Sequence, residues 1–532
     1  MIKVRNVLGF VVAASLLLSS MVVSASDKYP EDTLVMANFR DLRDLNPHLY
    51  GGELFAQNLL FEGLIFLGND GEPEPWLAES WEVSPDGKVY TFKLREDVMF
   101  SDGVKFDAHA AKKNFDAVLD NGARHGWLES VRMMMEIEES GKQSVRVKDD
   151  HTLEIEFSAP YYPFIIELGV TRPFRMLSPA CFKDGTTRNG VACLAGTGSY
   201  VLEMNRVDEY SEFVRNPNYW GESPSIGKIV AKVIPDNQAR LMALDNGGID
   251  LIYGLQLISP QAFQQFSEKK GFAGALSGPV STRMLVLNTT SENLRDVRVR
   301  RALQHLTSKE LISERIMLGL EAPAQTLFSR SIPYADIDLE PYHHDLSAAE
   351  KLLDEAGWVK SGQLRSRDGK PLEITLTYDT NKVMERTIAQ FLQGEWSRAG
   401  VKLNLVGEEE QAHRDRLMAG NFDISFNISW GTPYDPQSFL SGMLKPVYGD
   451  YAAQQGLAEK QRIDETILKA VAAVDEGERQ AHYTYILETL HREAVYLPLT
   501  YERNRAIFNS RVGNVGFNPS QFEIPLQFMT VQ

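Results

Sequence analysis

Apolar and polar positions alternate along this chain with two different periods, and the two kinds of stretch follow one another in turn. Residues 89–94 place apolar side chains at every second position, as a half-buried strand does. Residues 106–119 read as a helix, with Asp107 placed to cap it. The same reasoning predicts strands at 33–39, 282–287, 372–378, 402–407, 423–429 and 496–501, helices at 297–306, 346–356, 383–399 and 461–494, and a strand–helix–strand unit across 229–253. This alternation indicates an α/β fold with mixed sheets and flanking helices.

The length of 532 residues exceeds one hydrophobic core, which stops growing near roughly 250–300 residues. The sequence has no low-complexity tract, no fixed repeat and no Gly/Ser linker, so we expect domains joined by strands that act as hinges. The best crossing point is the stretch 271–281, with the return near Pro498. These boundaries predict a first lobe over 26–275 with subdomains, a second lobe over 276–498, and a return segment, 499–532, that completes the first lobe.

The first 25 residues have the pattern of a secretory signal peptide. Lys3 and Arg5 form a positive head, an apolar run spans 7–23, and Ala25 ends a short stretch of small side chains where cleavage is expected. A membrane anchor is the alternative, but the run is shorter than the roughly 20 residues that span a bilayer. We expect an exported, periplasmic protein. Loss of Lys3 and Arg5 takes the net charge from −17 to −19, which argues against nucleic acid or anionic lipid as a partner.

Only two cysteines are present, Cys181 and Cys193, in a Gly/Thr/Asn-rich stretch. In an oxidising compartment such a pair favours a local disulfide. The pair lacks the CxxC spacing typical of a metal site. We expect a bridge that staples a loop.

Motifs for catalysis are missing from the sequence. There is no G-x-S-x-G elbow, no HExxH, and no Walker or dinucleotide glycine pattern. The stretch 196–200 (GTGSY) has the composition of a turn before a strand, and the adjacent His343 and His344 fit a solvated loop. We therefore expect a protein that is not an enzyme and has no catalytic residue or catalytic cofactor. A secreted hydrolase is the least favoured alternative.

Arginine and aromatic residues recur together in four short segments: 124–127 (RHGW), 161–164 (YYPF), 172–175 (RPFR) and 430–436 (WGTPYDP). An arginine beside tryptophan in a partly closed cleft suits a ligand carboxylate, because the guanidinium supplies forked donors while the indole stacks and excludes water. The alternative is that the aromatic residues fill the core and the arginines pair with local acids.

Several phrases resemble the extracytoplasmic solute-binding proteins of the peptide/nickel class that serve ABC transporters. They are LNPHLY (45–50), PWLAESW (75–81), DGK (86–88), FSDG (100–103), FDA (106–108), GTG (196–198), RNPNYWG (215–221), DVRVRRA (296–302) and AGW (356–358). Within that family, the four arginine–aromatic segments resemble the periplasmic nickel-binding proteins in particular. The resemblance implies a two-lobed fold with the ligand cleft between the lobes, and a nickel(II) chelate of a small carboxylate compound, histidine-type or metallophore, as cargo.

The same resemblance assigns ligand-binding roles and partners. It implies that Arg172, helped by Arg124, binds the chelator carboxylate, and that aromatic residues line the pocket; these are Tyr50, Trp127, Trp430 and Tyr434. The expected partners are the permease subunits of an ABC transporter, with the protein itself a monomer.

Three positions bear on metal binding, and one further segment bears on the peptide alternative. Tyr448 stands where the nickel subgroup often has a loop histidine, and a phenol with a pKa near ~10 is a poor nickel ligand. Leu54 replaces a common methionine, and His125 is either a metal ligand or a structural hydrogen-bonding residue. Di- or oligopeptide binding is the alternative function, but residues 432–434 (TPY) replace the Asp-rich segment that meets a peptide amino terminus.

Overall fold

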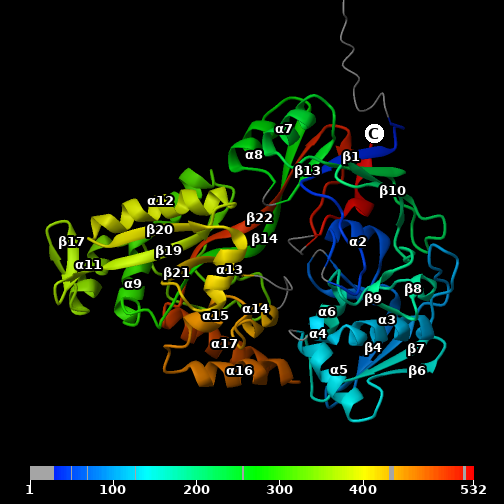
Figure 1. Ribbon diagram of the computed structural model, residues 1–532, viewed down its shortest axis with the longest axis horizontal. Coiled ribbons are helices and arrows are strands. Elements are labelled where there is room, and N and C mark those ends of the chain that lie inside the picture. The colour runs from blue at the N-terminus through cyan, green and yellow to red at the C-terminus, as the bar shows by residue number, and fades with distance from the viewer. Residues whose placement is uncertain are drawn as a thin grey trace, which may run out of the picture.

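The computed structural model describes residues 29–49, 51–68, 70–125, 128–254, 257–429, 436–518 and 523–532, so the predicted signal peptide lies outside the described residues. Two groups of elements lie on either side of two long strands, β14 (Phe272–Leu287) and β22 (Tyr496–Asn509), which pair with each other along most of their length (Figure 1). We call the elements around β1 the first lobe and those around β19 the second lobe. The predicted boundaries, at residues 275 and 498, fall within these two strands.

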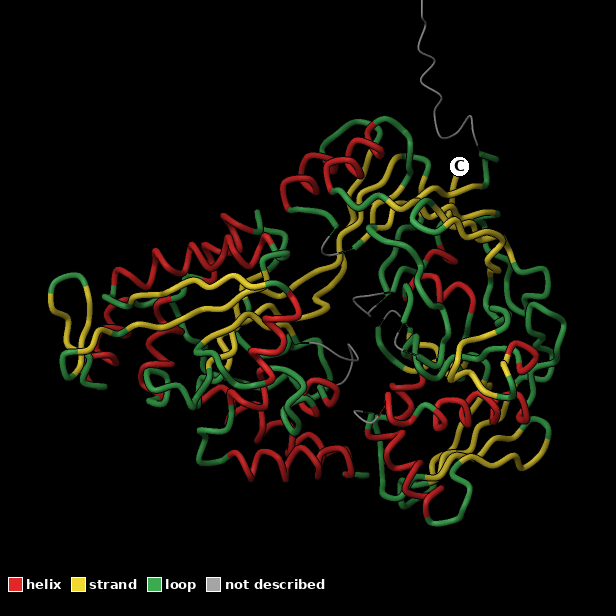
Figure 2. The backbone as a smooth tube through the Cα atoms, viewed as in Figure 1, coloured by secondary structure: helices red, strands yellow, loops and turns green. Residues whose placement is uncertain are grey.

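One mixed sheet runs through both lobes, and Figure 2 shows two of its strands passing from one lobe into the other. Its order is β10 (Tyr200–Arg206), β11 (Tyr210–Arg215), β12 (Lys228–Val233), β1 (Thr33–Asn38), β13 (Leu251–Tyr253), β22, β14, β21 (Ile424–Ile428), β19 (Glu373–Asp379) and β20 (Lys402–Glu408), with β15 (Ala322–Pro323) paired to β22. Strands β1, β12 and β13 pair in parallel, as do β19, β20 and β21, whereas β14 and β22 are antiparallel. The two parallel units are therefore joined by an antiparallel pair.

The first lobe adds a four-stranded sheet, of order β4-β5-β7-β6, and the helices that cover it. Its elements outside the long sheet are α2 (Leu54–Leu60), β2 (Ile65–Leu67), β3 (Pro73–Pro75), β4 (Ala78–Val83), β5 (Val89–Leu94), α3 (Ala108–Asp120), α4 (Gly122–His125), α5 (Glu129–Glu139), β6 (Val145–Asp149), β7 (Thr152–Glu156), α6 (Phe164–Gly169), β8 (Phe182–Lys183), β9 (Thr186–Val191), α7 (Asn237–Asp245), α8 (Pro260–Ser267), β23 (Val512–Gly513) and β24 (Thr530–Val531). The C-terminus lies in this lobe (Figure 1).

The second lobe packs helices against both faces of its strands. Alternate residues of β14 divide between two cores: Leu285 and Leu287 face one, and Met284 and Val286 face the other. Its further elements are α9 (Val297–Leu306), α10 (Lys309–Leu311), α11 (Leu346–Glu355), β16 (Val359–Ser361), β17 (Leu364–Arg367), β18 (Lys370–Pro371), α12 (Val383–Arg398), α13 (Glu410–Met418), α14 (Gln437–Ser441), α15 (Gly449–Ala453), α16 (Lys460–Ala472) and α17 (Glu476–Arg492).

The single long helix predicted over 461–494 is wrong. Helix α16 ends at Ala472, and α17 begins only at Glu476. Between them Asp475 adopts an extended conformation, and its side chain accepts a hydrogen bond from the backbone N–H of Glu478, which caps α17. The cap provides an acceptor for a backbone N–H of the first turn of α17, which a continuous helix would have bonded to a carbonyl four residues earlier.

A buried ion network lies where β14 and β22 cross between the lobes. Arg283 of β14 forms an ion pair with Glu502 of β22 and lies 3.5 Å from Glu321. Arg505 Nη2 donates to Glu321 Oε1 at 2.5 Å, and the hydroxyl of Thr500 donates to Glu321 Oε2 at 2.7 Å. Glu321 is fully buried. Removing one partner would leave another buried charge uncompensated, so we expect the network to hold β14 and β22 in a fixed arrangement.

The buried carboxyl group of Glu62 brings together residues from several of the motifs quoted above. Trp76 and Trp220, from the PWLAESW and RNPNYWG phrases, donate their indole N–H groups to the two carboxylate oxygens of Glu62 at 2.9 and 2.8 Å. Burial raises the pKa of Glu62 to about 7 and outweighs the two indole donors, which lower that pKa. These motif residues therefore build the first lobe around one buried acid.

Candidate functional site

Arg172 lies in the loop after α6 and is attached to a glycine turn. Its Nη1 donates to the carbonyl oxygen of Gly51 at 2.6 Å and lies 3.4 Å from that of Gly52, and the residue is half-buried. Gly52 has φ of +73°, and a Cβ there would lie 2.3 Å from the carbonyl oxygen of Asp44. The turn thus requires glycine. It follows Tyr50 directly in sequence, so Arg172 is held beside the segment that carries this predicted pocket residue.

The second arginine of the RPFR segment has a different role. Arg175 is 1% exposed, and its guanidinium carbon lies 4.6 Å from the centre of the Trp76 ring. Burial lowers the pKa of Arg175 to about 10, although the carboxylates of Glu523 and Glu62 oppose the shift. Arg175 therefore belongs to the packed interior, whereas Arg172, three residues earlier, is half-buried.

Arg124 and His125 end the short helix α4 and differ in exposure. Arg124 is exposed, while His125 is fully buried and donates its Nε2–H to the backbone carbonyl oxygen of His48 at 2.8 Å. Burial lowers the pKa of His125, so the ring is neutral. This contact favours the structural alternative for His125 over the metal-ligand alternative.

His48 is a positioning residue that the sequence reasoning missed. It is fully buried, with Nε2 2.9 Å from Asn114 Oδ1 and Nδ1 3.1 Å from the hydroxyl of Thr187. Because Asn114 Oδ1 also accepts from the N–H of Leu177, it is an acceptor, and His48 is assigned the tautomer that donates from Nε2. Burial lowers the pKa of His48 to about 4. Its place in the LNPHLY phrase was the available signal.

These contacts bring both predicted arginine segments to one stretch of chain. His125, next to Arg124, bonds the backbone of His48, and Arg172 bonds the backbone of Gly51. The neutral side chain of His48 in turn fixes that stretch to α3 and β9 through Asn114 and Thr187. These hydrogen bonds hold the two arginine segments in a fixed arrangement around the stretch from His48 to Gly51.

The four aromatic residues predicted to line the pocket, Tyr50, Trp127, Trp430 and Tyr434, lie outside the described residues. Tyr448 is half-buried immediately before α15, with the guanidinium of Arg414 5.2 Å from its ring centre. Leu54 is half-buried as the first residue of α2. The contact between the Tyr448 ring and Arg414 is a cation–π interaction, which involves no metal.

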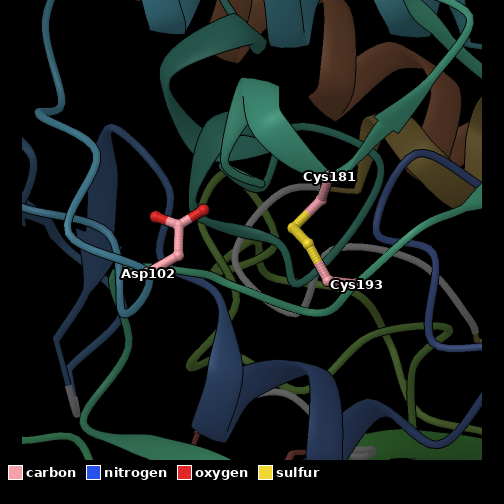
Figure 3. Close-up of side chains that lie close together, drawn as sticks. All are labelled: Asp102, Cys181 and Cys193. Atoms are coloured by element: carbon pink, nitrogen blue, oxygen red, sulfur yellow. A yellow bond between two sulfur atoms is a disulfide. The ribbon is translucent and has the colours of Figure 1, made fainter.

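Cys181 and Cys193 form a disulfide with their Cα atoms 4.8 Å apart, which closes the β8–β9 hairpin. Together with Asp102 they are the one cluster of three potential metal ligands found within the described parts of the chain (Figure 3). The two sulfurs are bonded to each other, so neither is a thiolate, the form that binds metals. This cluster is therefore a structural bridge beside an exposed acid.

Two α/β lobes connected by crossing strands are the architecture expected of a solute-binding protein. The chain belongs to that class: residues 72–450 match the bacterial extracellular solute-binding proteins, family 5 (middle region). Members of this family bind solutes for transport. In the part of the chain that the structure describes, the helices are too short or too polar to cross a membrane.

Individual relatives narrow the comparison. The chain is 41% identical to the nickel-binding periplasmic protein of Escherichia coli K12 over 487 residues, 91% of each chain. It is 26% identical to the periplasmic oligopeptide-binding protein OppA of Salmonella typhimurium, over 96% of this chain and 94% of the relative. The crystal structure of NikA from Brucella suis in complex with Fe(III)-EDTA superimposes with a TM-score of 0.90 at 41% identity, covering 94% of this chain and all of that one. These relatives are similar over nearly their full length.

Proposed function

We propose that this protein is the extracytoplasmic binding component of an ABC importer. It captures nickel as a complex with a small carboxylate chelator and delivers that complex to the permease. The observation that carries the proposal is Arg172, half-buried and attached to the turn after Tyr50, in a chain 41% identical to a nickel-binding periplasmic protein. Export to the periplasm with cleavage near Ala25, and action as a monomer, complete the proposal.

The chemistry of the cargo fits the residues that the chain offers. A chelator such as histidine supplies the metal ligands and presents a carboxylate, which a guanidinium binds through charge-assisted hydrogen bonds. A relative at 41% identity was crystallised in complex with Fe(III)-EDTA, a chelate of a metal with a carboxylate compound. A site that grips the chelator does not need a protein histidine on the metal, which is consistent with Tyr448 at the usual loop-histidine position.

Binding is expected to proceed by closure of the two lobes about β14 and β22. A ligand that contacts both lobes shifts the equilibrium towards the closed form, and the permease recognises that form. We expect the moving boundary to lie within these two strands, which contain the predicted divisions near residues 275 and 498.

The test replaces the carboxylate anchor. A charge-assisted hydrogen bond contributes about 1.5–3 kcal/mol, so Arg172→Ala should weaken binding of nickel(II) with L-histidine by more than about tenfold, the equivalent of ~1.4 kcal/mol. Isothermal titration calorimetry measures the change. Arg206→Ala, which removes an arginine whose side chain is 57% exposed on the same lobe, is the matched control and should bind as the unaltered protein does. Equal affinities for both variants would remove Arg172 from the site.

A further inference from the structure

A tyrosine of the first lobe is inserted into an aromatic cluster of the second. Tyr162, directly before α6, lies with its hydroxyl 2.7 Å from that of Tyr483, and its ring meets Tyr334 edge-on with centres 6.2 Å apart. Tyr334 and Tyr483 stack on each other at 5.0 Å. The guanidinium carbon of Arg479 lies 3.5 Å from the centre of the Tyr162 ring. Tyr162 therefore packs against the rings of Tyr334 and Tyr483 and the guanidinium of Arg479.

Arg479 is held in place by its own lobe. Its Nη1 donates to the hydroxyl of Tyr334 at 3.0 Å, and its Nη2 donates to the backbone carbonyl oxygen of Ala473 at 2.7 Å. The residue is 9% exposed. A cation that is already oriented and mostly desolvated interacts more strongly with an aromatic face than a mobile surface cation does.

The contact is reciprocal, which distinguishes it from a chance approach of two surfaces. Tyr162 packs against a core of the second lobe, while Val471, at the end of α16, is part of a core of the first lobe. The backbone N–H of Tyr162 donates to the carbonyl oxygen of Val471 at 3.4 Å. Nearby, a Cβ on Gly87 would lie 3.1 Å from a methyl group of Val474. Each lobe thus buries a side chain of the other.

The position of this contact makes it dependent on closure. Helices α16 and α17 lie at the opposite end of the interlobe region from β14 and β22 (Figure 1). Rotation about the two strands moves elements far from them the most, so opening the lobes separates Tyr162 from Arg479.

The same short helix connects this contact to the predicted carboxylate anchor. Tyr162 precedes α6 and Arg172 follows it. Tyr161 and Phe164, on either side of Tyr162, are buried in the first-lobe core and fix the segment. A change in the position of α6 therefore acts on both the interlobe contact and the loop of Arg172.

We propose that Tyr162 and Arg479 form an interlobe latch that stabilises the closed form and so raises ligand affinity without touching the ligand. In this proposal, the YYPF segment (161–164) functions by supplying Tyr162 to the latch. Its effect on affinity rests on the proposed function, whereas its effect on the lobe equilibrium does not.

The experiment measures lobe separation and binding on the same variants. Spin labels at Val104→Cys in the first lobe and Leu468→Cys on α16, both exposed positions, report the distance distribution by electron–electron double resonance. Without ligand, Tyr162→Ala should shift this distribution to longer distances, and Tyr162→Phe, which keeps the ring, should lie between it and the parent protein. With nickel(II) and L-histidine, Tyr162→Ala should raise the dissociation constant about tenfold, mainly through faster dissociation.

The matched control is Tyr210→Ala. Tyr210 also lies under an arginine, with Arg206 5.5 Å from its ring centre, but both residues belong to the first lobe. This variant should change neither distance nor affinity. Identical distance distributions for the parent and Tyr162→Ala would overturn the latch whatever the ligand. Failure of the parent to bind nickel with histidine would instead overturn the proposed cargo, and the distance measurement would still decide the latch.

Discussion

The ion network at the crossing strands gives a quantitative prediction for Glu321→Gln. Glu321 is fully buried and accepts hydrogen bonds from Arg505 at 2.5 Å and Thr500 at 2.7 Å, with Arg283 at 3.5 Å. Removing one partner of a buried ion pair costs about 3–5 kcal/mol, because the other charge stays buried without compensation. Arg283 keeps its pair with Glu502, so the loss falls mainly on Arg505 and the lower end, about 3 kcal/mol, is expected.

Urea denaturation followed by circular dichroism measures this loss as a shift of the transition to lower urea, with the two lobes fitted separately where the transition is not two-state. Glu209→Gln is the control. That side chain is 65% exposed and lies 3.9 Å from Arg206, so its removal should leave the transition in place. A loss below about 1 kcal/mol for Glu321→Gln would refute the view that this network fixes the crossing strands.

Two further predictions concern the first lobe. Burial raises the pKa of Glu62 from 4.5 to about 7, so the folded protein binds more protons than the unfolded chain between these values, and unfolding free energy falls by up to about 3 kcal/mol as pH rises through this window. Glu62→Gln should remove that slope in urea denaturation from pH 4.5 to 7.5, and an unchanged slope would assign it to other groups. Replacing both Cys181 and Cys193 by serine opens a loop with a sequence separation of 12, which should lower the unfolding free energy by about 2–3 kcal/mol. The affinity for nickel with histidine should stay unchanged. Weaker binding by calorimetry would contradict a purely structural bridge.

Local signals predicted two helices that begin behind an aspartate cap, although the cap at Asp475 was missed. Helix α9 has the predicted bounds, with Asp296 accepting from the N–H of Arg298, and α3 begins behind Asp107 as expected. Strand β14 begins ten residues before the predicted start at 282, because its first half contains Gly274, Gly278 and Pro279, which disfavour strand formation by propensity. Pairing with β22 overrides that propensity, and the register of the pair shifts around Gly278 and Pro279.

The site could be predicted only as far as local motifs reach. The arginine–aromatic segments made Arg172 a candidate, but its hydrogen bond to Gly51 joins residues more than a hundred positions apart. The same is true of the contact between Tyr162 and Tyr483. His48 was overlooked because the sequence around a lone histidine does not indicate its buried partners. These are Asn114 of α3 and Thr187 of β9. Long-range hydrogen bonds of this kind leave no periodic pattern in the sequence.

The proposed cargo is a metal chelate held through its carboxylate. Elemental analysis with native mass spectrometry, on the protein purified from the periplasm of nickel-supplemented cells, tests this most directly. We expect about one nickel per protein, accompanied by a small carboxylate compound whose mass is released on denaturation. Metal-free protein that carries a di- or oligopeptide would contradict it and would establish the peptide alternative.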